Sequence, residues 1–213
     1  MFFSFQGRVP GFIPSPLFEM KQVHGDRILL LDSPEKFDLL YRTEADAVIC
    51  TVPQIAIAVR TADCVPILIS HPYGIVAAVH AGWRGTKLRI LQKTLVQIKE
   101  KFNVDLSEIH VVIGPSICEK CYEVGEEVAI AILNEVESLG QEDGLVAKKN
   151  GGKYFLNLKL ANQLLARAAG VLESQLTVRP ECTLCNEEEF YSYRGSNKKQ
   201  EPSEGRNYSW IKF

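Results

Sequence analysis

Short apolar runs bounded by polar and turn-forming residues dominate the first part of the chain. Such runs predict β-strands. Residues 65–70 and 74–79 flank the turn sequence His71-Pro72-Tyr73-Gly74, which predicts a buried hairpin. Further strands are expected at residues 23–31, 45–51 and 54–59.

After residue 85 the pattern of apolar residues changes from short continuous runs to single residues spaced by three and four. Between residues 86 and 102, leucine, isoleucine and phenylalanine recur at spacings of three and four, which predicts an amphipathic helix. Two more helices are expected at residues 126–139 and 157–169, the second with Asn157 as N-cap and Gly170 as C-terminal stop. The remaining strands are predicted at residues 109–113, 176–178, 189–193 and 208–213, and the polar segment 140–153 is predicted to be a surface loop.

The order of these elements indicates the fold class. Strands come first along the chain, and strands and helices are mixed after them, which favours an α+β architecture with mixed β-sheets over a doubly wound parallel fold. A length of 213 residues usually makes one domain and allows a substantial core without disulfides or a structural metal. We therefore expect a single domain over residues 1–213.

Charge and composition exclude several classes of partner. The formal net charge is -2, so no global basic field attracts nucleic acid or anionic lipid. No apolar run is long enough to span a bilayer, and Arg8 and the prolines after it interrupt the apolar N-terminus, unlike a secretory signal. We expect a cytoplasmic location, no nucleic-acid or membrane partner, and six cysteines that remain thiols.

Three short segments carry candidate chemistry. His24 begins a predicted strand, Cys64 lies in a loop between apolar strands, and His80 ends a buried strand. Strand ends are positions where distant parts of a chain meet on a rigid base. Two imidazoles and one thiolate suit zinc, leaving a fourth position for water or substrate, and zinc-bound water has a pKa of about 7. The alternative for each residue is structural: a hydrogen-bonded histidine or a buried free cysteine.

The turn Gly82-Trp83-Arg84-Gly85 precedes the longest predicted helix. Backbone N–H groups of such a turn and of the helix N-terminus can cradle an anion, with Arg84 adding charge. The sequence lacks the Lys-Ser/Thr ending of a Walker loop. The alternative is an ordinary helix start with Arg84 in solvent.

Two CxxC pairs, Cys118/Cys121 and Cys182/Cys185, follow or adjoin turn sequences. Such pairs are typical of structural zinc when each lies on a knuckle turn, and the alternative is partly buried free thiols. A zinc-dependent nucleobase deaminase would need His-x-Glu and Pro-Cys-x-x-Cys. Neither motif is present, so a deaminase of that fold is disfavoured.

A cysteine hydrolase is the main mechanistic alternative. Cys64 would be the nucleophile and His80 or His24 its base, with Asp63 or Asp26 orienting the imidazole. A thiolate serves both as metal ligand and as nucleophile, so the same residues fit both interpretations.

At these residues the chain resembles the YfiH-like family, whose members carry names such as laccase-domain protein, polyphenol oxidase and purine nucleoside phosphorylase. The resemblance runs in family order across nearly the whole chain. The matching segments are Lys21-Gln22-Val23-His24-Gly25, Glu44-Ala45-Asp46-Ala47, Arg60-Thr61-Ala62-Asp63-Cys64-Val65-Pro66, His80-Ala81-Gly82-Trp83-Arg84-Gly85, Ile113-Gly114-Pro115-Ser116-Ile117, Cys121-Tyr122-Glu123-Val124-Gly125, Phe190-Tyr191-Ser192-Tyr193-Arg194 and Gly205-Arg206.

The resemblance implies a four-layer α/β/β/α fold and a zinc ion bound by His24, Cys64 and His80, which would also be the catalytic residues. It implies phosphorolysis of adenosine, inosine and methylthioadenosine, with adenosine deamination as a side activity. The expected ligands are then a purine nucleoside and phosphate, and the expected state is a monomer or homodimer.

Phosphorolysis requires a site for phosphate, and Arg60, Arg84 and Arg194 are the candidates for its charge. The family's older label makes a copper-dependent polyphenol oxidase a further alternative. Multicopper catalysis normally needs several histidines per cluster, whereas this chain has four in all. A non-catalytic binding role is the remaining alternative.

Overall fold

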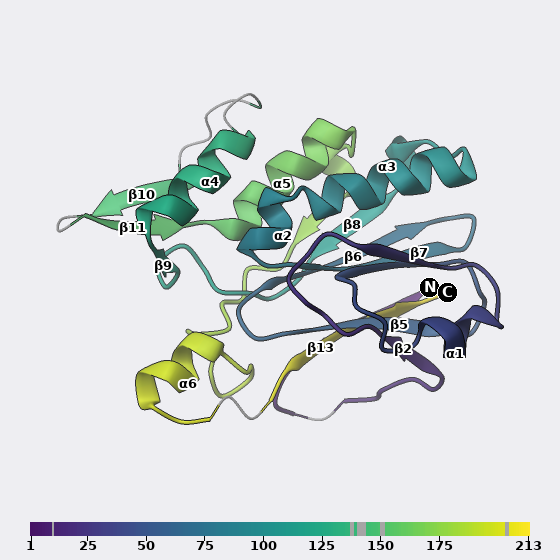
Figure 1. The fold of residues 1–213 in the computed structure, drawn as a ribbon, viewed down its shortest axis with the longest axis horizontal. Helices are drawn as coiled ribbons and strands as arrows, with labels where there is room; N and C mark the ends of the chain where they lie inside the picture. Colours follow the sequence, from purple (N-terminus) through teal and green to yellow (C-terminus); the bar gives the residue numbers. More distant parts are fainter. Residues whose placement is uncertain (10, 137–138, 140–143, 150–151, 203–204) are drawn as a thin grey trace.

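Two mixed β-sheets stack face to face at the centre of the molecule (Figure 1). The computed structural model describes residues 1–9, 11–136, 139, 144–149, 152–202 and 205–213. The larger sheet consists, in spatial order, of β12 (Leu176–Val178), β8 (His110–Ile113), β6 (Val65–His71), β7 (Ile75–Ala81), β4 (Ala47–Cys50) and β3 (Ile28–Leu31). The smaller sheet consists of β1 (Phe2–Gln6), β13 (Asn207–Lys212), β5 (Ala56–Thr61) and β2 (Leu17–Glu19).

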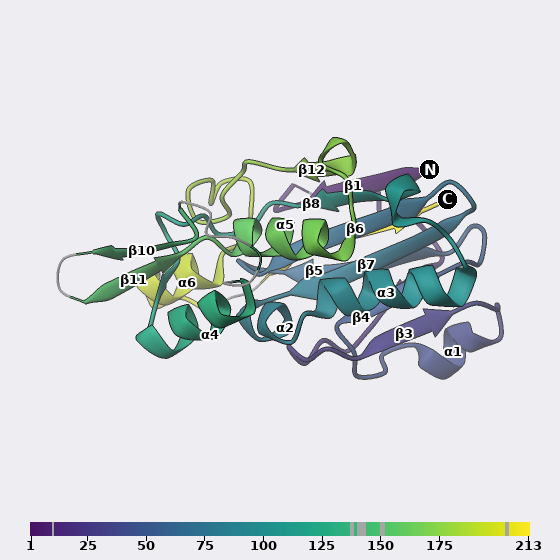
Figure 2. The same cartoon turned by 90° about the horizontal axis from the view of Figure 1, so that it is seen from above.

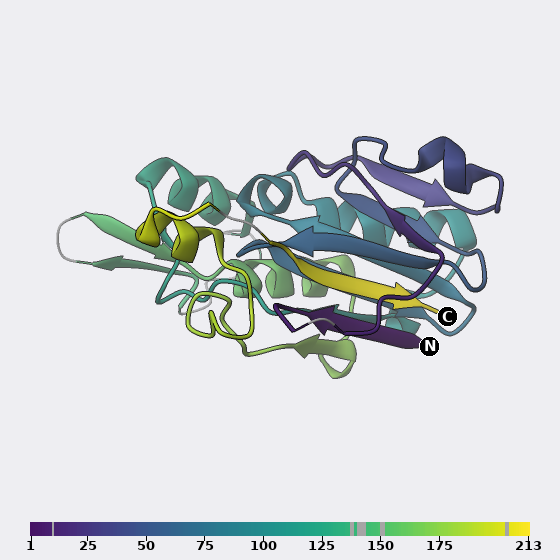
Figure 3. The same cartoon turned by 90° about the horizontal axis from the view of Figure 1, so that it is seen from below.

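Helices cover the outer face of the larger sheet (Figures 1 and 2). They are α2 (Trp83–Lys87), α3 (Ile90–Phe102), α4 (Glu126–Val136) and α5 (Leu158–Ala169). Beyond α4 lies a small sheet of β10 (Val146–Lys149), β11 (Lys153–Leu156) and β9 (Glu123–Val124). The short helices α1 (Lys36–Leu40) and α6 (Tyr193–Lys199) lie at opposite ends, α6 on the side of the smaller sheet (Figure 3).

The hairpin β6–β7 is buried on both faces. Along β7, Ile75, Ala77 and Val79 face the helices, whereas Val76 and Ala78 face the smaller sheet. A strand covered on both sides needs apolar residues at every position, which explains its continuous apolar run. The predicted hairpin is confirmed, as is the α+β fold with mixed, layered sheets: β3–β4 and β8–β12 are parallel pairs among antiparallel ones.

The structure corrects four predicted elements. The single helix at residues 86–102 is two helices, because Arg89 adopts a left-handed backbone (φ 58°) and its side chain bonds to Glu135 of α4. The prediction of a strand at 189–193 is wrong, because Ser192 is the N-cap of α6 and its hydroxyl group accepts a hydrogen bond from the amide of Gly195. Only residues 28–31 of the strand at 23–31 are extended. Part of the predicted loop 140–153 forms β10, while 140–143 and 150–151 lie outside the described residues.

The remaining helix ends follow the predicted signals. The side chain of Asn157 accepts a hydrogen bond from the amide of Leu160 at 3.0 Å, and Gly170 adopts the left-handed conformation that ends α5. The helix predicted at 126–139 ends as α4 at Val136, and residues 137–138 lie outside the described residues. Within the described part of the chain, no helix combines the length and the apolar character that crossing a bilayer requires.

Replacing Asn157 by alanine should lower the free energy of unfolding by about 1 kcal/mol, because an N-cap side chain satisfies an otherwise unpaired amide of the first turn. Urea denaturation followed by circular dichroism measures the change. A matched Asn134→Ala variant removes an exposed asparagine within α4, which caps no helix, and should not lower stability. An Asn157→Ala variant as stable as wild type would contradict this role.

Candidate metal centre

Three segments meet at the end of the β6–β7 hairpin. His80 lies near the end of β7, Cys64 directly precedes β6, and His24 lies in the loop before β3. Their donor atoms all lie within 4.8 Å of one another, and the two imidazole rings are 4.7 Å apart in an edge-on arrangement. His80 is buried, Cys64 half-buried and His24 exposed. The structure therefore brings together the three residues that the sequence singled out.

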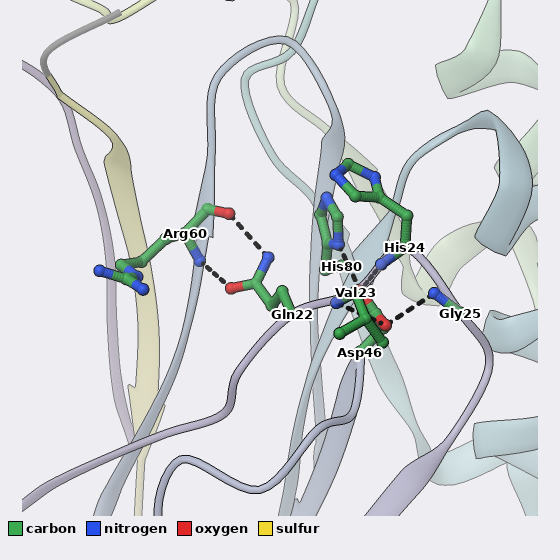
Figure 4. Close-up of polar contacts among 7 residues, drawn as sticks. All are labelled: Gln22, Val23, His24, Gly25, Asp46, Arg60 and His80. Carbon is green, nitrogen blue, oxygen red and sulfur yellow. Dashed lines mark hydrogen bonds and ion pairs between the residues drawn. The ribbon is translucent and has the colours of Figure 1, made fainter.

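A buried carboxylate, Asp46, organises this site (Figure 4). The Nδ1–H of His80 donates to Asp46 at 2.8 Å, which leaves Nε2 as the nitrogen available for a ligand role. The same carboxylate accepts hydrogen bonds from the backbone amides of Val23, His24 and Gly25 at 3.2, 2.9 and 2.7 Å. These bonds bend the chain around Asp46 and hold His24 at a left-handed φ of 61°. Residues 23–25 are not extended because their amides bind this side chain.

The three residues are also coupled electrostatically. Burial raises the pKa of the Cys64 thiol, but hydrogen bonds and charge from His24 and His80 outweigh burial and lower that pKa to about 6. Burial lowers the pKa of His80, but Asp46 and the Cys64 thiolate outweigh it and raise that pKa to about 9. The pKa of Asp46 is lowered, because hydrogen bonds from His80 and the amides outweigh its burial. The site thus holds a thiolate at neutral pH, the form that binds metals and attacks electrophiles.

Gly82 leaves the space beside the donor atoms open. A Cβ at this position would lie 3.0 Å from the Cys64 sulfur and 3.2 Å from Nδ1 of His24. The backbone of Gly82 is extended with φ -70°, which any residue can adopt, so the space alone accounts for the need for glycine. Two imidazoles, one thiolate and an uncrowded position between them fit a zinc ion with an open coordination position.

Replacing Gly82 by alanine should lower the affinity for zinc by about tenfold or more, because the added methyl group pushes two donor atoms apart and small shifts of ligands are costly. Competition with a chromophoric chelator measures the affinity. The matched variant Gly25→Ala should change it little, since its Cβ would meet only ordinary contacts from 3.6 Å outward. Unchanged zinc affinity in Gly82→Ala would contradict the proposed ligand set.

The cysteine-hydrolase alternative predicts that Asp63 or Asp26 orients an imidazole, but in the structure both carboxylates bind other partners. Asp63 accepts hydrogen bonds from the hydroxyl of Thr183 at 2.6 Å and from the amide of Arg194 at 2.7 Å. Asp26 pairs with Lys93 at the surface. The carboxylate that holds an imidazole is Asp46, which sequence reasoning missed as a site residue. Its available signal was a carboxylate set directly before an apolar strand.

Two cavities meet at the cluster. The larger, of about 980 Å³, has His24, Cys64 and His80 in its wall. The smaller, of about 200 Å³, shares His24 and Cys64 with it. The basic residues of the larger cavity are Lys21, Arg42, Arg60, Arg84 and Arg206. The aromatic residues of the smaller cavity are Trp83, Tyr122 and Tyr193, beside Arg84 and Arg194.

The three predicted arginines therefore occupy different positions. Arg60 lines the larger cavity and Arg194 the smaller one, whereas Arg84 lines both. The guanidinium of Arg84 lies 4.5 Å from the centre of the Trp83 ring, and that of Arg194 lies 5.2 Å from the Tyr122 ring. Lys21, Arg42 and Arg206 were missed as site residues, although Lys21 and Arg206 lie within matching family segments.

Part of the basic charge is compensated within the larger cavity. Arg60 and Arg42 both approach the buried carboxylate of Glu19, at 3.4 and 3.0 Å. The side chain of Gln22 exchanges two hydrogen bonds of 2.8 Å with the backbone of Arg60 and so fixes the segment that leads to His24 (Figure 4). Arg84 is exposed beside the His24/Cys64/His80 cluster, and its guanidinium lies over the Trp83 ring. Among the described residues no carboxylate pairs with it, which makes Arg84 the strongest candidate to bind an anionic ligand.

The family described as multi-copper polyphenol oxidoreductase laccase matches residues 8–213. The chain belongs to this family. Solved structures of the same fold include the YfiH protein of Bacillus licheniformis, with a TM-score of 0.83 and 30% identity over 92% of this chain and 74% of that one. YlmD from Geobacillus stearothermophilus has a TM-score of 0.80 and 29% identity, over 92% and 73% of the two chains. The resemblance to the YfiH-like family is thereby confirmed.

Relatives of this laccase-like chain carry names that point away from copper oxidation. A purine nucleoside phosphorylase of Deinococcus radiodurans is 35% identical over 185 residues, covering 86% of this chain and 66% of the relative. Adenosine deaminase RL5 from an unknown prokaryotic organism is 36% identical over 182 residues, covering 82% and 68%. The chain thus spans just under two thirds of the Deinococcus protein's length.

Proposed function

We propose that this laccase-family protein is a zinc-dependent purine nucleoside phosphorylase acting on adenosine, inosine and methylthioadenosine, with adenosine deamination as a side activity. The observation that carries the proposal is the His24/Cys64/His80 cluster at the meeting point of a basic and an aromatic cavity. A nucleoside phosphorylase needs both, one for phosphate and one for the base. The names of relatives at about 35% identity support the same activity.

In this proposal His24, Cys64 and His80 hold the zinc ion, which supplies a Lewis-acid centre with one open position. Asp46 keeps His80 in the tautomer whose Nε2 can bind a metal. The purine stacks against Trp83, Tyr122 or Tyr193 in the smaller cavity, as flat rings do with aromatic side chains. Phosphate binds to Arg84 and Arg60 in the larger cavity through charge-assisted hydrogen bonds. Arg194, which lines the smaller cavity, positions the base or ribose.

The number of histidines argues against multicopper oxidation. Two nitrogens and one thiolate form one mononuclear site, whose donors suit zinc or a single copper ion, whereas multicopper oxidation needs further histidine-rich centres. Among the described residues, the other group able to hold a metal consists of four cysteines and no histidine. His71, a third histidine, is buried in β6 and faces Glu108.

Product analysis tests this function. Zinc-replete protein incubated with adenosine should release adenine and ribose-1-phosphate only when phosphate is present. Inosine in both mixtures would show deamination as the main activity. The absence of any product from adenosine, inosine and methylthioadenosine would overturn the proposal and favour the cysteine hydrolase, whose thiolate would act without metal.

Replacing Arg84 by alanine should raise the KM for phosphate about tenfold or more, because a hydrogen bond to a charged group contributes about 1.5–3 kcal/mol. Initial rates at varied phosphate and saturating nucleoside measure the effect. The matched variant Arg167→Ala removes an arginine that pairs with Glu173 and lines neither cavity. A KM for phosphate equal to that of wild type would remove Arg84 from this role.

A further inference from the structure

A second cluster of metal-binding type lies outside the proposed active site. The sulfur atoms of Cys118, Cys121, Cys182 and Cys185 all lie within 4.8 Å of one another. The Cys121 and Cys185 sulfurs are 3.4 Å apart. The two CxxC pairs thus contribute two sulfurs each to one place, although 64 residues separate them along the chain.

The sheet itself brings these pairs together. β8 and β12 are parallel neighbours, with Ile113 opposite Val178, and one CxxC pair follows each strand. The pairing continues beyond both strands in a bridge between Ser116 and Cys182, where the amide of Thr183 donates to the carbonyl of Ser116 at 3.2 Å. The cluster is therefore fixed by the larger sheet and not by a chance approach of loops.

Each CxxC pair forms a tight turn. The carbonyl of Cys118 accepts a hydrogen bond from the amide of Cys121 at 3.0 Å, and the carbonyl of Cys182 accepts one from Asn186 at 3.1 Å. The amide of Cys118 donates to the Cys182 sulfur at 3.3 Å. Amide donors of this kind stabilise a thiolate, and paired CxxC turns are the arrangement of zinc knuckles.

A buried positive charge accompanies the cluster. Lys159 is only 7% exposed, and its ammonium donates to the carbonyls of Arg179 and Glu181 at 2.9 and 2.7 Å. Burial lowers the pKa of Lys159. A buried ammonium is stabilised by nearby negative charge, and a zinc ion with four thiolates carries a net charge of -2.

We propose that Cys118, Cys121, Cys182 and Cys185 bind a structural zinc ion through four thiolates. Four protein ligands leave no open position, so this site is structural and not catalytic. Zinc binding displaces the four thiol protons and changes no oxidation state. The ion ties the segment after β8 to the segment after β12, which carries Thr183 and Arg194 and their hydrogen bonds to Asp63. This site does not depend on the proposed nucleoside activity.

Metal analysis of variants tests the second site. Wild-type protein purified with a thiol reductant should contain two zinc ions per chain by inductively coupled plasma mass spectrometry. Cys64→Ala and Cys185→Ser should each contain one, and the double variant none. The matched variant Cys50→Ala, which removes a buried thiol that belongs to neither cluster, should keep two. A single zinc in wild type that Cys185→Ser retains would overturn the proposal.

X-ray absorption at the zinc edge tests the site without altering it. The Cys64→Ala protein should show four sulfur ligands at about 2.3 Å and no nitrogen shell. Nitrogen or oxygen ligands at the remaining zinc would contradict the assignment. Alkylation of unreduced, chelator-treated, denatured protein should modify five thiols in Cys64→Ala. Modification of three or fewer would show disulfides in the cluster and would overturn the zinc site.

Discussion

Cys64→Ala protein should lose one zinc ion per chain and lower nucleoside turnover by at least about 10²-fold. Loss of groups around the ligands of a metal typically costs about 10–100-fold in affinity or activity, and loss of a ligand costs no less. Cys64 supplies the only anionic donor among the three residues of the cluster. Its removal leaves two imidazoles, a much weaker site for zinc.

Metal content and turnover must be measured on the same preparation. Cys50→Ala is the control, because Cys50 is a fully buried thiol outside both clusters. A Cys64→Ala protein that keeps both its metal and its activity would contradict the proposed ligand set. Loss of activity from a wild type that never contained metal would instead support Cys64 as the nucleophile of a hydrolase.

Replacing Asp46 by alanine should lower the free energy of unfolding by about 3–5 kcal/mol, because it leaves His80 and three backbone amides without their buried partner. The isosteric Asp46→Asn should cost less in stability but lower zinc affinity about 10–100-fold. The asparagine side chain cannot hold the charged carboxylate's bond to Nδ1–H of His80 at full strength.

Urea denaturation and chelator competition measure these two effects. Asp26→Asn is the matched control, since Asp26 lies two residues from His24 but pairs with Lys93 at the surface. An exposed pair of this kind contributes about 0–1 kcal/mol. Asp46 variants that match Asp26→Asn in both stability and zinc affinity would show that Asp46 does not organise the centre.

The two clusters lie on one connected framework. Cys182 is followed by Thr183, whose hydroxyl bonds to Asp63, and Asp63 precedes Cys64. The other oxygen of Asp63 binds the amide of Arg194 at the start of α6. Asp63 therefore links the segment that carries Cys182 and Cys185 to the residues beside the proposed active site.

The elements predicted best from the sequence are those whose pattern depends on local burial. The β6–β7 hairpin and α5 follow directly from continuous apolar runs and from capping residues. His24, Cys64 and His80 were identified because strand ends collect distant side chains, although their ligand role remains a proposal.

The errors arise where side chains from distant segments decide the backbone. The predicted helix breaks at Arg89, whose backbone is left-handed and whose side chain binds Glu135 of α4, a contact that no local pattern encodes. Residues 23–25 leave the strand conformation because their amides bind Asp46. Asp46 lies within a matching family segment, but a single carboxylate before a strand indicates no site role until its partners are known.

Reconstitution of metal-free protein distinguishes zinc-dependent phosphorolysis from copper-dependent oxidation. Protein stripped with a chelator under reducing conditions would be reloaded with zinc or with copper(II), and phosphate-dependent release of adenine from adenosine would be measured beside oxygen uptake with a phenol. Zinc should restore adenine release in wild type but not in Cys64→Ala, and copper should give no oxygen uptake. Full adenine release without metal, or phenol oxidation with copper and no release with zinc, would contradict it.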